Sequence, residues 1–168
     1  TLMDGTISVN SELEKGSTFK VELDFDTAES KEEKSSYNHR VLEALKVLVA
    51  DDDRDCCIHT TLLLENLGIK SKWVMTGAEC VDEVLSAHKV GEEYDVCLID
   101  WKMPDMDGVE TARSIRRIVG PDTLVIIMSA YDWTEIEARA REAGVDFFIS
   151  KPIFQSVVQD VLLQATRR

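Results

Sequence analysis

A run of four apolar residues that ends in a carboxylate constrains the fold of this chain more than any other stretch. The run is Val96–Ile99, the carboxylate is Asp100, and a loop containing Pro104 and Gly108 follows directly. A short apolar run bounded by turn residues is typical of a strand buried in a parallel sheet. Because parallel sheets carry their functional groups just beyond the carboxyl ends of the strands, we expect Asp100 at the mouth of a cleft.

From residue 46 onward, strand and helix patterns alternate. We expect strands over Lys46–Ala50, Lys70–Val74, Tyr94–Asp100, Leu124–Ser129 and Asp146–Ser150. We expect helices over Arg54–Leu67, Ala78–His88, Gly108–Val119, Trp133–Ala143 and Phe154–Ala165. Thr76 and Glu79 form a capping-box pattern, and Gly68 and Gly144 fit helix C-caps. These βα units predict an α/β fold, a doubly wound parallel sheet with helices on both faces.

The first 45 residues follow a different pattern. Apolar and polar side chains alternate over residues 6–9 and 19–25 around a turn-rich segment, which predicts a β-hairpin within residues 1–27. Because an isolated hairpin is marginal in water, and because the chain does not begin with Met, we expect a fragment cut from a larger protein. Residues 28–45 are charged and contain serines, which predicts a solvated linker before a main domain over 46–168.

Composition excludes several classes of function. The net charge of −13 argues against nucleic acid as a direct partner. The longest apolar runs are well short of the roughly 20 residues that a membrane-spanning helix needs. No Cys-x-x-Cys pair occurs, so we expect reduced thiols rather than a disulfide framework or a zinc site at Cys56, Cys57, Cys80 and Cys97.

Polar residues follow four of the five predicted strands. Asp51-Asp52-Asp53 follows the first strand, Asp100 ends the third, Ser129 ends the fourth and Lys151 follows the fifth. Carboxylates that converge at one sheet edge are costly without a cation, and such an oxygen cluster suits Mg²⁺. Together these groups suit phosphoryl transfer onto a carboxylate, with Asp100 as the nucleophile and the metal and Lys151 neutralising charge.

Two other functions are consistent with parts of this pattern. Asp51-x-Asp53 after a strand is similar to the nucleophile and acid of a haloacid-dehalogenase-like phosphatase, in which Asp51 would be the nucleophile. That alternative lacks the acidic pair expected after the lysine and leaves Met103-Pro104 unexplained. The other alternative is an interaction module that is independent of phosphorylation, which the complete set of acidic residues, Ser129 and Lys151 argues against.

Residues 46–168 resemble a receiver domain of two-component signalling. The motifs that match are the Asp51-Asp52 pair, Asp100 in an Ile-Asp-x-x-Met-Pro-x-x-Asp-Gly setting, Ser129-Ala130, Phe148 and Lys151-Pro152. The resemblance implies a flavodoxin-like (βα)5 fold with the parallel strand order 2-1-3-4-5. Residues 3–9 and 15–19 resemble the last strands of the ATP-binding domain of sensor histidine kinases. Both resemblances together imply a hybrid sensor histidine kinase, of which this chain, lacking the ATP-binding core, would be a cytoplasmic part.

The resemblance also implies a role for each site residue. Asp100 is the phosphoacceptor, and Asp52, Asp100 and the backbone carbonyl of Lys102 are direct Mg²⁺ ligands, with Asp51 acting through water. Ser129 binds the phosphoryl group and Lys151 pairs with it, across a cis Lys151-Pro152 peptide. Ser129 and Phe148 form the conformational switch.

The implied partner is a phosphohistidine donor, either a kinase dimerisation domain or a histidine phosphotransfer protein. We expect Ile58 and Leu62, which lie off the sheet-facing side of the first helix, to contribute to its docking. Burial of this pair against the linker or the hairpin is the alternative. Lys102 and Tyr131 each lie two residues after a functional residue, and we expect Tyr131 to shield the acyl phosphate from water. The sequence is compatible with a homodimer as well as with a monomer.

Overall fold

The computed structural model describes residues 5–13, 15–24, 32–130, 132, 134 and 136–166, with only the backbone described for residues 32–37. The chain divides near residue 32 into two units, which are treated separately below. No helix among the described residues is long and apolar enough to cross a membrane.

The N-terminal unit contains the predicted hairpin. Strands β1 (Thr6–Glu12) and β2 (Gly16–Glu22) pair antiparallel, with Ile7 opposite Val21 and Val9 opposite Phe19. All four of these apolar side chains are exposed, from 60% for Val9 and Val21 to 72% for Ile7. The hairpin therefore presents an apolar face that nothing within its own two strands covers.

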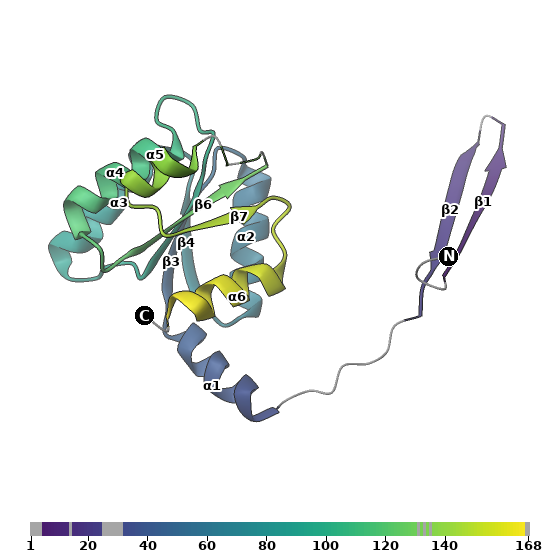
Figure 1. The fold of residues 1–168 in the computed structure, drawn as a ribbon, viewed down its shortest axis with the longest axis horizontal. Helices are drawn as coiled ribbons and strands as arrows, with labels where there is room; N and C mark the ends of the chain where they lie inside the picture. Colours follow the sequence, from purple (N-terminus) through teal and green to yellow (C-terminus); the bar gives the residue numbers. More distant parts are fainter. Residues whose placement is uncertain are drawn as a thin grey trace. The chain divides into compact units, whose positions relative to one another are not determined.

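The C-terminal unit is built on a five-stranded parallel sheet in the order β4-β3-β5-β6-β7 (Figure 1). Its strands are β3 (Lys46–Ala50), β4 (Lys70–Val74), β5 (Val96–Asp100), β6 (Leu124–Ser129) and β7 (Phe147–Ser150). Its helices are α1 (Glu32–Glu43), α2 (Arg54–Asn66), α3 (Gly77–Val90), α4 (Gly108–Val119), α5 (Glu137–Glu142) and α6 (Gln155–Ala165). Counted along the chain from β3 as strand 1 to β7 as strand 5, the strands lie in the order 2-1-3-4-5. This order confirms the predicted doubly wound sheet.

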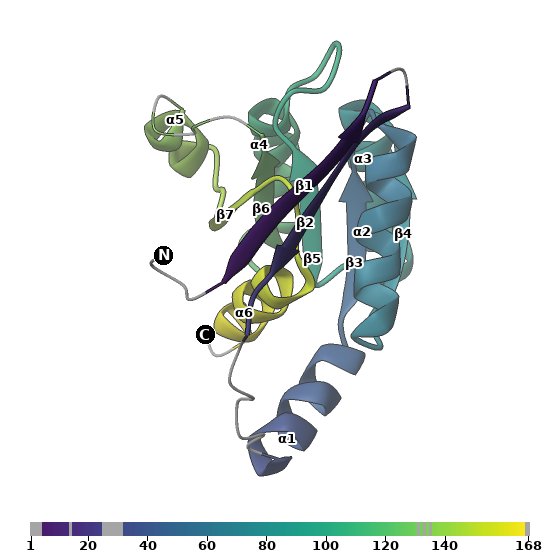
Figure 2. The same ribbon diagram turned by 90° about the vertical axis from the view of Figure 1, so that its right-hand side faces the viewer.

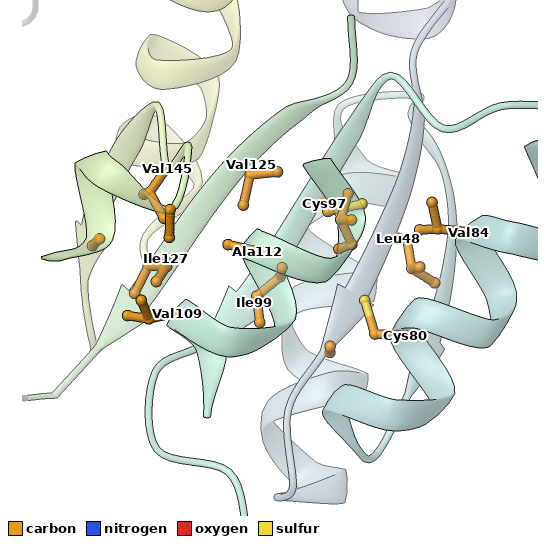
Figure 3. Packing of buried hydrophobic residues seen from close by; sticks show 14 of the residues in the cluster. Leu48, Cys80, Val84, Cys97, Ile99, Val109, Ala112, Val125, Ile127 and Val145 are labelled. Atoms are coloured by element: carbon orange, nitrogen blue, oxygen red, sulfur yellow. The ribbon is translucent and has the colours of Figure 1, made fainter. Parts of the chain in front are cut away.

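Helices cover both faces of the sheet and enclose two hydrophobic clusters (Figure 2). On one face, α3, α4 and α5 bury residues such as Val84, Ala112 and Ala140 against Leu48, Ile99 and other strand side chains (Figure 3). On the other face, α1, α2 and α6 contribute Leu42, Leu64 and Leu162. Strand β5 is buried along its whole length, as its uninterrupted apolar sequence predicts.

Helix α1 lies within the segment that we predicted to be a solvated linker. Leu42 is 1% exposed and Leu45 is 9% exposed, and both belong to the hydrophobic cluster that α2 and α6 cover. The prediction missed this helix because most of its residues are charged or polar. Leu42 near the end of the helix and Leu45 just after it pack this segment onto the sheet, and packing rather than propensity stabilises most short helices.

Two helices differ in detail from the prediction. Helix α2 ends at Asn66, one residue before its predicted end, and its buried side carries Cys57, Thr60 and Leu64. Helix α5 is shorter than expected, and Trp133 in its predicted first turn lies outside the described residues.

Helix α3 begins with the cap that the sequence predicts. The backbone N–H of Glu79 donates to Thr76 Oγ1 at 3.1 Å, and Glu79 Oε2 accepts from the N–H of Met75 at 2.9 Å. The second bond reaches one residue before the N-cap, so it is a shifted form of the capping box. Gly68 and Gly144, the two predicted helix-end glycines, both have positive φ, at 78° and 91°.

Candidate active site

The polar residues that follow the strands meet at one edge of the sheet. Strands β3, β5, β6 and β7 are consecutive neighbours in the sheet and run parallel, so their carboxyl ends lie together. Three of the side chains placed there are almost fully buried: Asp51 is 1% exposed, Asp100 is 7% and Ser129 is 2%. A buried carboxylate needs a partner, so this edge is where unusual chemistry is expected.

Lys151 is the partner of both buried carboxylates. Its Nζ lies 2.6 Å from Asp51 Oδ2 and 2.5 Å from Asp100 Oδ1, although the two aspartates come from different strands. The Lys151-Pro152 peptide that follows β7 is cis, as the resemblance to receiver domains implies. The side chain of Lys151 is only 18% exposed, so its ammonium is held in place by the two carboxylates rather than by water.

The charges of this triad shift one another's pKa values. Burial raises the pKa of Asp51 above its ordinary value, and the ion pair with Lys151 opposes part of that rise. Burial alone would lower the pKa of Lys151, but its hydrogen bonds to Asp100 and Asp51 raise it above its ordinary value. Lys151 is therefore fully protonated at neutral pH and provides a fixed positive charge beside Asp100.

Backbone groups orient the two carboxylates. The N–H of Asp53 donates to Asp51 Oδ1 at 3.0 Å, and the N–H of Lys102 donates to Asp100 Oδ2 at 2.8 Å. Each carboxylate thus has one oxygen on the backbone and the other on Lys151. Asp100 is held rigidly, with the lysine ammonium beside one oxygen and a backbone amide beside the other.

The loop after Asp100 packs against the backbone of Asp100 itself. The N–H of Gly108 donates to the carbonyl of Trp101 at 2.8 Å, which closes the loop back onto the strand end. A Cβ atom at position 108 would lie 2.5 Å from the carbonyl oxygen of Asp100. Only glycine permits this close approach, which explains the Gly108 of the opening motif.

A pocket of about 210 Å³ opens beside the carboxylate of Asp100. It is lined by Asp100, Trp101, Lys102, Ser129, Ala130 and Lys151. The Nζ of Lys102 lies 5.2 Å from the centroid of the Trp101 ring, so the two side chains form one wall together. Trp101 was not singled out from the sequence, although its position directly after Asp100 was a usable signal.

The remaining acidic residues play unequal parts. Asp53 is the N-cap of α2, and its carboxylate accepts from the N–H groups of Asp55 and Cys56 at 2.8 and 3.3 Å. This capping role accounts for the third Asp of the sequence motif. Asp52 is exposed, and the described residues contain no group of three His, Cys, Asp or Glu side chains arranged around a common metal position.

The chemistry of the donors nevertheless fits Mg²⁺. Two carboxylates from neighbouring strands already face one cation, the ammonium of Lys151, and Asp52 adds an exposed carboxylate next to Asp51. Mg²⁺ prefers one or two carboxylates together with water and phosphate oxygens, so it does not require three protein side chains. Asp52, Asp100 and the Lys102 carbonyl would hold the ion, with Asp51 acting through water.

The other predicted residues lie as follows. Ile58 and Leu62 are 40% and 53% exposed on α2, so they are not buried within the C-terminal unit. Phe148 is half-buried on β7, the neighbour of the strand that ends in Ser129. Tyr131, the predicted shield of the acyl phosphate, lies outside the described residues. All four cysteines are free thiols.

Comparisons with known sequences are consistent with this site. Residues 47–163 match the family "Response regulator receiver domain". The chain is 28% identical over 166 residues to the autoinducer 2 sensor kinase/phosphatase LuxQ of Vibrio vulnificus, covering 96% of this chain and 19% of that protein. It is 31% identical over 153 residues to the aerobic respiration control sensor protein ArcB of Escherichia coli, covering 90% of this chain and 19% of that protein. The chain therefore spans about a fifth of the length of such relatives.

Solved structures share the fold. The receiver domain of the sensor histidine kinase PA1611 from Pseudomonas aeruginosa, described with a magnesium ion coordinated in its active site cleft, has a TM-score of 0.65 at 22% identity, covering 74% of this chain and 98% of that one. The receiver domain of the putative response regulator NarL from Mycobacterium tuberculosis has a TM-score of 0.63 at 27% identity, with 74% and 98% covered. Nothing among these comparisons supports a haloacid-dehalogenase-like phosphatase. The chain belongs to the response regulator receiver domain family of two-component signalling.

Proposed function

We propose that this chain accepts a phosphoryl group on Asp100 from a phosphohistidine donor. The observation that carries the proposal is the pairing of a buried, backbone-oriented carboxylate with the Lys151 ammonium at 2.5 Å, in a pocket that Ser129 also lines. A carboxylate fixed in this way is a nucleophile, and the ammonium offsets the charge that arrives with the phosphoryl group.

The transfer step needs only the phosphohistidine donor and a proton from water. An oxygen of Asp100 forms a bond to phosphorus as the phosphorus–nitrogen bond of the phosphohistidine breaks. The bonding electron pair stays on the imidazole nitrogen, which takes up a proton from water. Lys151 exchanges part of its contact with Asp100 for a phosphoryl oxygen, and the Ser129 hydroxyl donates to another. The product is an acyl phosphate on Asp100.

We further propose Mg²⁺ as the cofactor, bound by Asp52, Asp100 and the Lys102 carbonyl, with Asp51 acting through water. Bound there, the ion would neutralise phosphoryl oxygens in the same way as Lys151. The magnesium ion described in the related PA1611 receiver domain supports this part of the proposal. Ser129 and Phe148 act as the switch, since the hydroxyl is drawn toward the phosphoryl group and leaves space for the ring.

Ile58 and Leu62 form the docking contact for the donor protein. Replacing Leu62 with Ser should slow transfer from a phosphohistidine donor domain by about tenfold, because a half-exposed apolar contact is lost at the interface. Single-turnover transfer from a donor domain active on the unmodified chain would measure this rate. Phosphorylation by acetyl phosphate, which needs no docking, should be unchanged, and equal slowing with both donors would contradict the proposal.

The whole protein is, in this proposal, a hybrid sensor histidine kinase. The relatives support this, because LuxQ and ArcB are described as sensor proteins and this chain matches a fifth of their length. Residues 1–27 would be the last strands of the kinase ATP-binding domain, whose remaining strands would cover the apolar hairpin face. The protein would act in the cytoplasm with a protein donor and without nucleic acid.

Incubation with acetyl phosphate tests the function directly. With Mg²⁺ present, the chain should gain the mass of one phosphoryl group, and hydroxylamine should remove it because acyl phosphates react with this nucleophile. Removing Mg²⁺ with a chelator should reduce labelling by at least about a hundredfold, since the charge on the phosphoryl oxygens then lacks its divalent partner. Absence of labelling in the presence of Mg²⁺, or a label that resists hydroxylamine, would refute the proposed function.

A further inference from the structure

We propose that Arg141 of α5 positions the ring of Phe148 in the unphosphorylated chain and thereby sets how readily the switch responds. This inference rests on the proposed function, in which Ser129 and Phe148 form the switch. Arg141 touches neither Asp100 nor the phosphoryl pocket, so it acts as a positioning residue through Phe148.

Strand register places Ser129 and Phe148 on one face of the sheet. Strands β6 and β7 pair in parallel with Ile127 opposite Phe148 and Ser129 opposite Ser150. Because side chains alternate between faces, Ile127 and Ser129 point to the same face, and Phe148 shares that face with Ile127. Ile127 and Phe148 both belong to the cluster that α3, α4 and α5 cover. A change in the position of the Ser129 side chain therefore affects the packing of the side chains beneath α5.

Arg141 lies over the ring of Phe148, which is only partly buried against the cluster. Its Cζ is 5.6 Å from the ring centroid, within the range of a cation–π contact. The guanidinium is braced from its own helix, since Arg141 Nε donates to Glu137 Oε1 at 2.9 Å. The ring is thus held between the hydrophobic cluster on one side and an oriented cation on the other.

A second arginine ties the same helix to the phosphoacceptor loop. Arg139 Nη2 lies 2.8 Å from Asp107 Oδ2, and the other oxygen of Asp107 caps α4 by accepting from the N–H of Glu110. Helix α5 has no side-chain hydrogen bond at its own N-cap. Its placement therefore depends on side-chain contacts, and two of these reach the loop after Asp100 and the switch ring.

Movement of the ring away from its present position must break the Arg141 contact. A cation–π contact of a partly exposed arginine corresponds to a factor of about two to five in an equilibrium constant. Arg141 therefore biases the switch toward the unphosphorylated arrangement without locking it there. A ligand that favours the switched arrangement should bind more tightly once the contact is removed.

Beryllofluoride, a phosphoryl mimic, serves as the probe, with Mg²⁺ present. Arg141→Met keeps the aliphatic stem and removes the cation. We expect its beryllofluoride affinity to rise about two- to fivefold over the unmodified chain, as measured by NMR titration. The ring resonances of Phe148 in the free variant should shift toward their beryllofluoride-bound positions. Arg141→Lys, which keeps a cation, should lie between the two.

Arg113→Met is the matched control, because Arg113 is exposed on α4 and an arginine is again exchanged for methionine. It should leave both the affinity and the Phe148 resonances unchanged. Unchanged or weaker affinity in Arg141→Met would overturn the inference while leaving the proposed function intact. Failure of the unmodified chain to bind beryllofluoride would instead refute the proposed function and this inference with it.

Discussion

Replacing Asp100 with Asn should abolish phosphorylation of the chain by acetyl phosphate. The amide has nearly the same shape as the carboxylate, and its oxygen can still accept from the N–H of Lys102. It has neither the charge nor the nucleophilic oxygen that attacks phosphorus, so labelling should fall by at least about a thousandfold. Intact-protein mass spectrometry over a time course measures the loss.

Asp82→Asn provides the control for this substitution. Asp82 is exposed on α3 and does not line the pocket beside Asp100, so the same chemical change there should leave labelling unaffected. Persistent labelling of Asp100→Asn at the rate of the unmodified chain would show that another residue accepts the phosphoryl group. Labelling that disappears only in Asp51→Asn would point to Asp51 as the nucleophile.

Replacing Lys151 with Met should have the second largest effect, on phosphorylation and on stability together. The substitution leaves two carboxylates, 1% and 7% exposed, without the ammonium that both contact. Breaking a buried ion pair from one side destabilises a protein by about 3 kcal/mol or more at neutral pH. Phosphorylation should fall by about a hundredfold, because the charge of the incoming group is then offset by fewer cations.

The pH dependence of this loss has a definite sign. Burial already raises the pKa of Asp51 although Lys151 opposes the rise, so removing Lys151 should raise that pKa further. A carboxyl whose pKa is higher in the folded state than in the unfolded state favours folding as it becomes protonated. The variant should therefore regain stability as the pH falls from neutrality through the folded-state pKa of Asp51.

Urea unfolding of Lys151→Met at neutral pH and near pH 5 measures this recovery. Added Mg²⁺ should also stabilise the variant at neutral pH, since a divalent cation can replace the lost ammonium between the carboxylates. Lys89→Met, at an exposed position of α3, should behave like the unmodified chain. Equal stability of Lys151→Met and the unmodified chain at neutral pH would show that the two ion pairs contribute nothing.

Most of the sheet could be predicted because its signals are local. Strand β5 is largely a continuous apolar run, and polar residues either end their strand, as in β5 and β6, or follow it directly, as after β3 and β7. Neighbouring parallel strands have their carboxyl ends at the same edge of the sheet. The sequence alone therefore predicted that Asp51, Asp100, Ser129 and Lys151 lie together. Helix α1 could not be predicted in this way, because its burial depends on the packing of Leu42 against strands that are distant in sequence.

The finer geometry of the site also depends on packing between distant elements. No sequence pattern relates Arg141 to Phe148, since the contact arises only where α5 lies on the sheet. The exact placement of Lys151 between two aspartates also depends on such packing, because Asp51 and Lys151 are one hundred residues apart in sequence. By contrast, the capping role of Asp53 follows from local sequence and could have been predicted.

Helix α1 changes what counts as the unit of folding in this chain. The family match begins at residue 47, yet Leu42 is 1% exposed and belongs to the same cluster as Ile149 and Ile153, which flank Lys151. A protein trimmed to the family boundary would lack part of the packing around Lys151 and the proposed phosphorylation site. The region that matches the family and the packed unit thus have different N-terminal limits here, because Leu42 packs in the same cluster as the residues around Lys151.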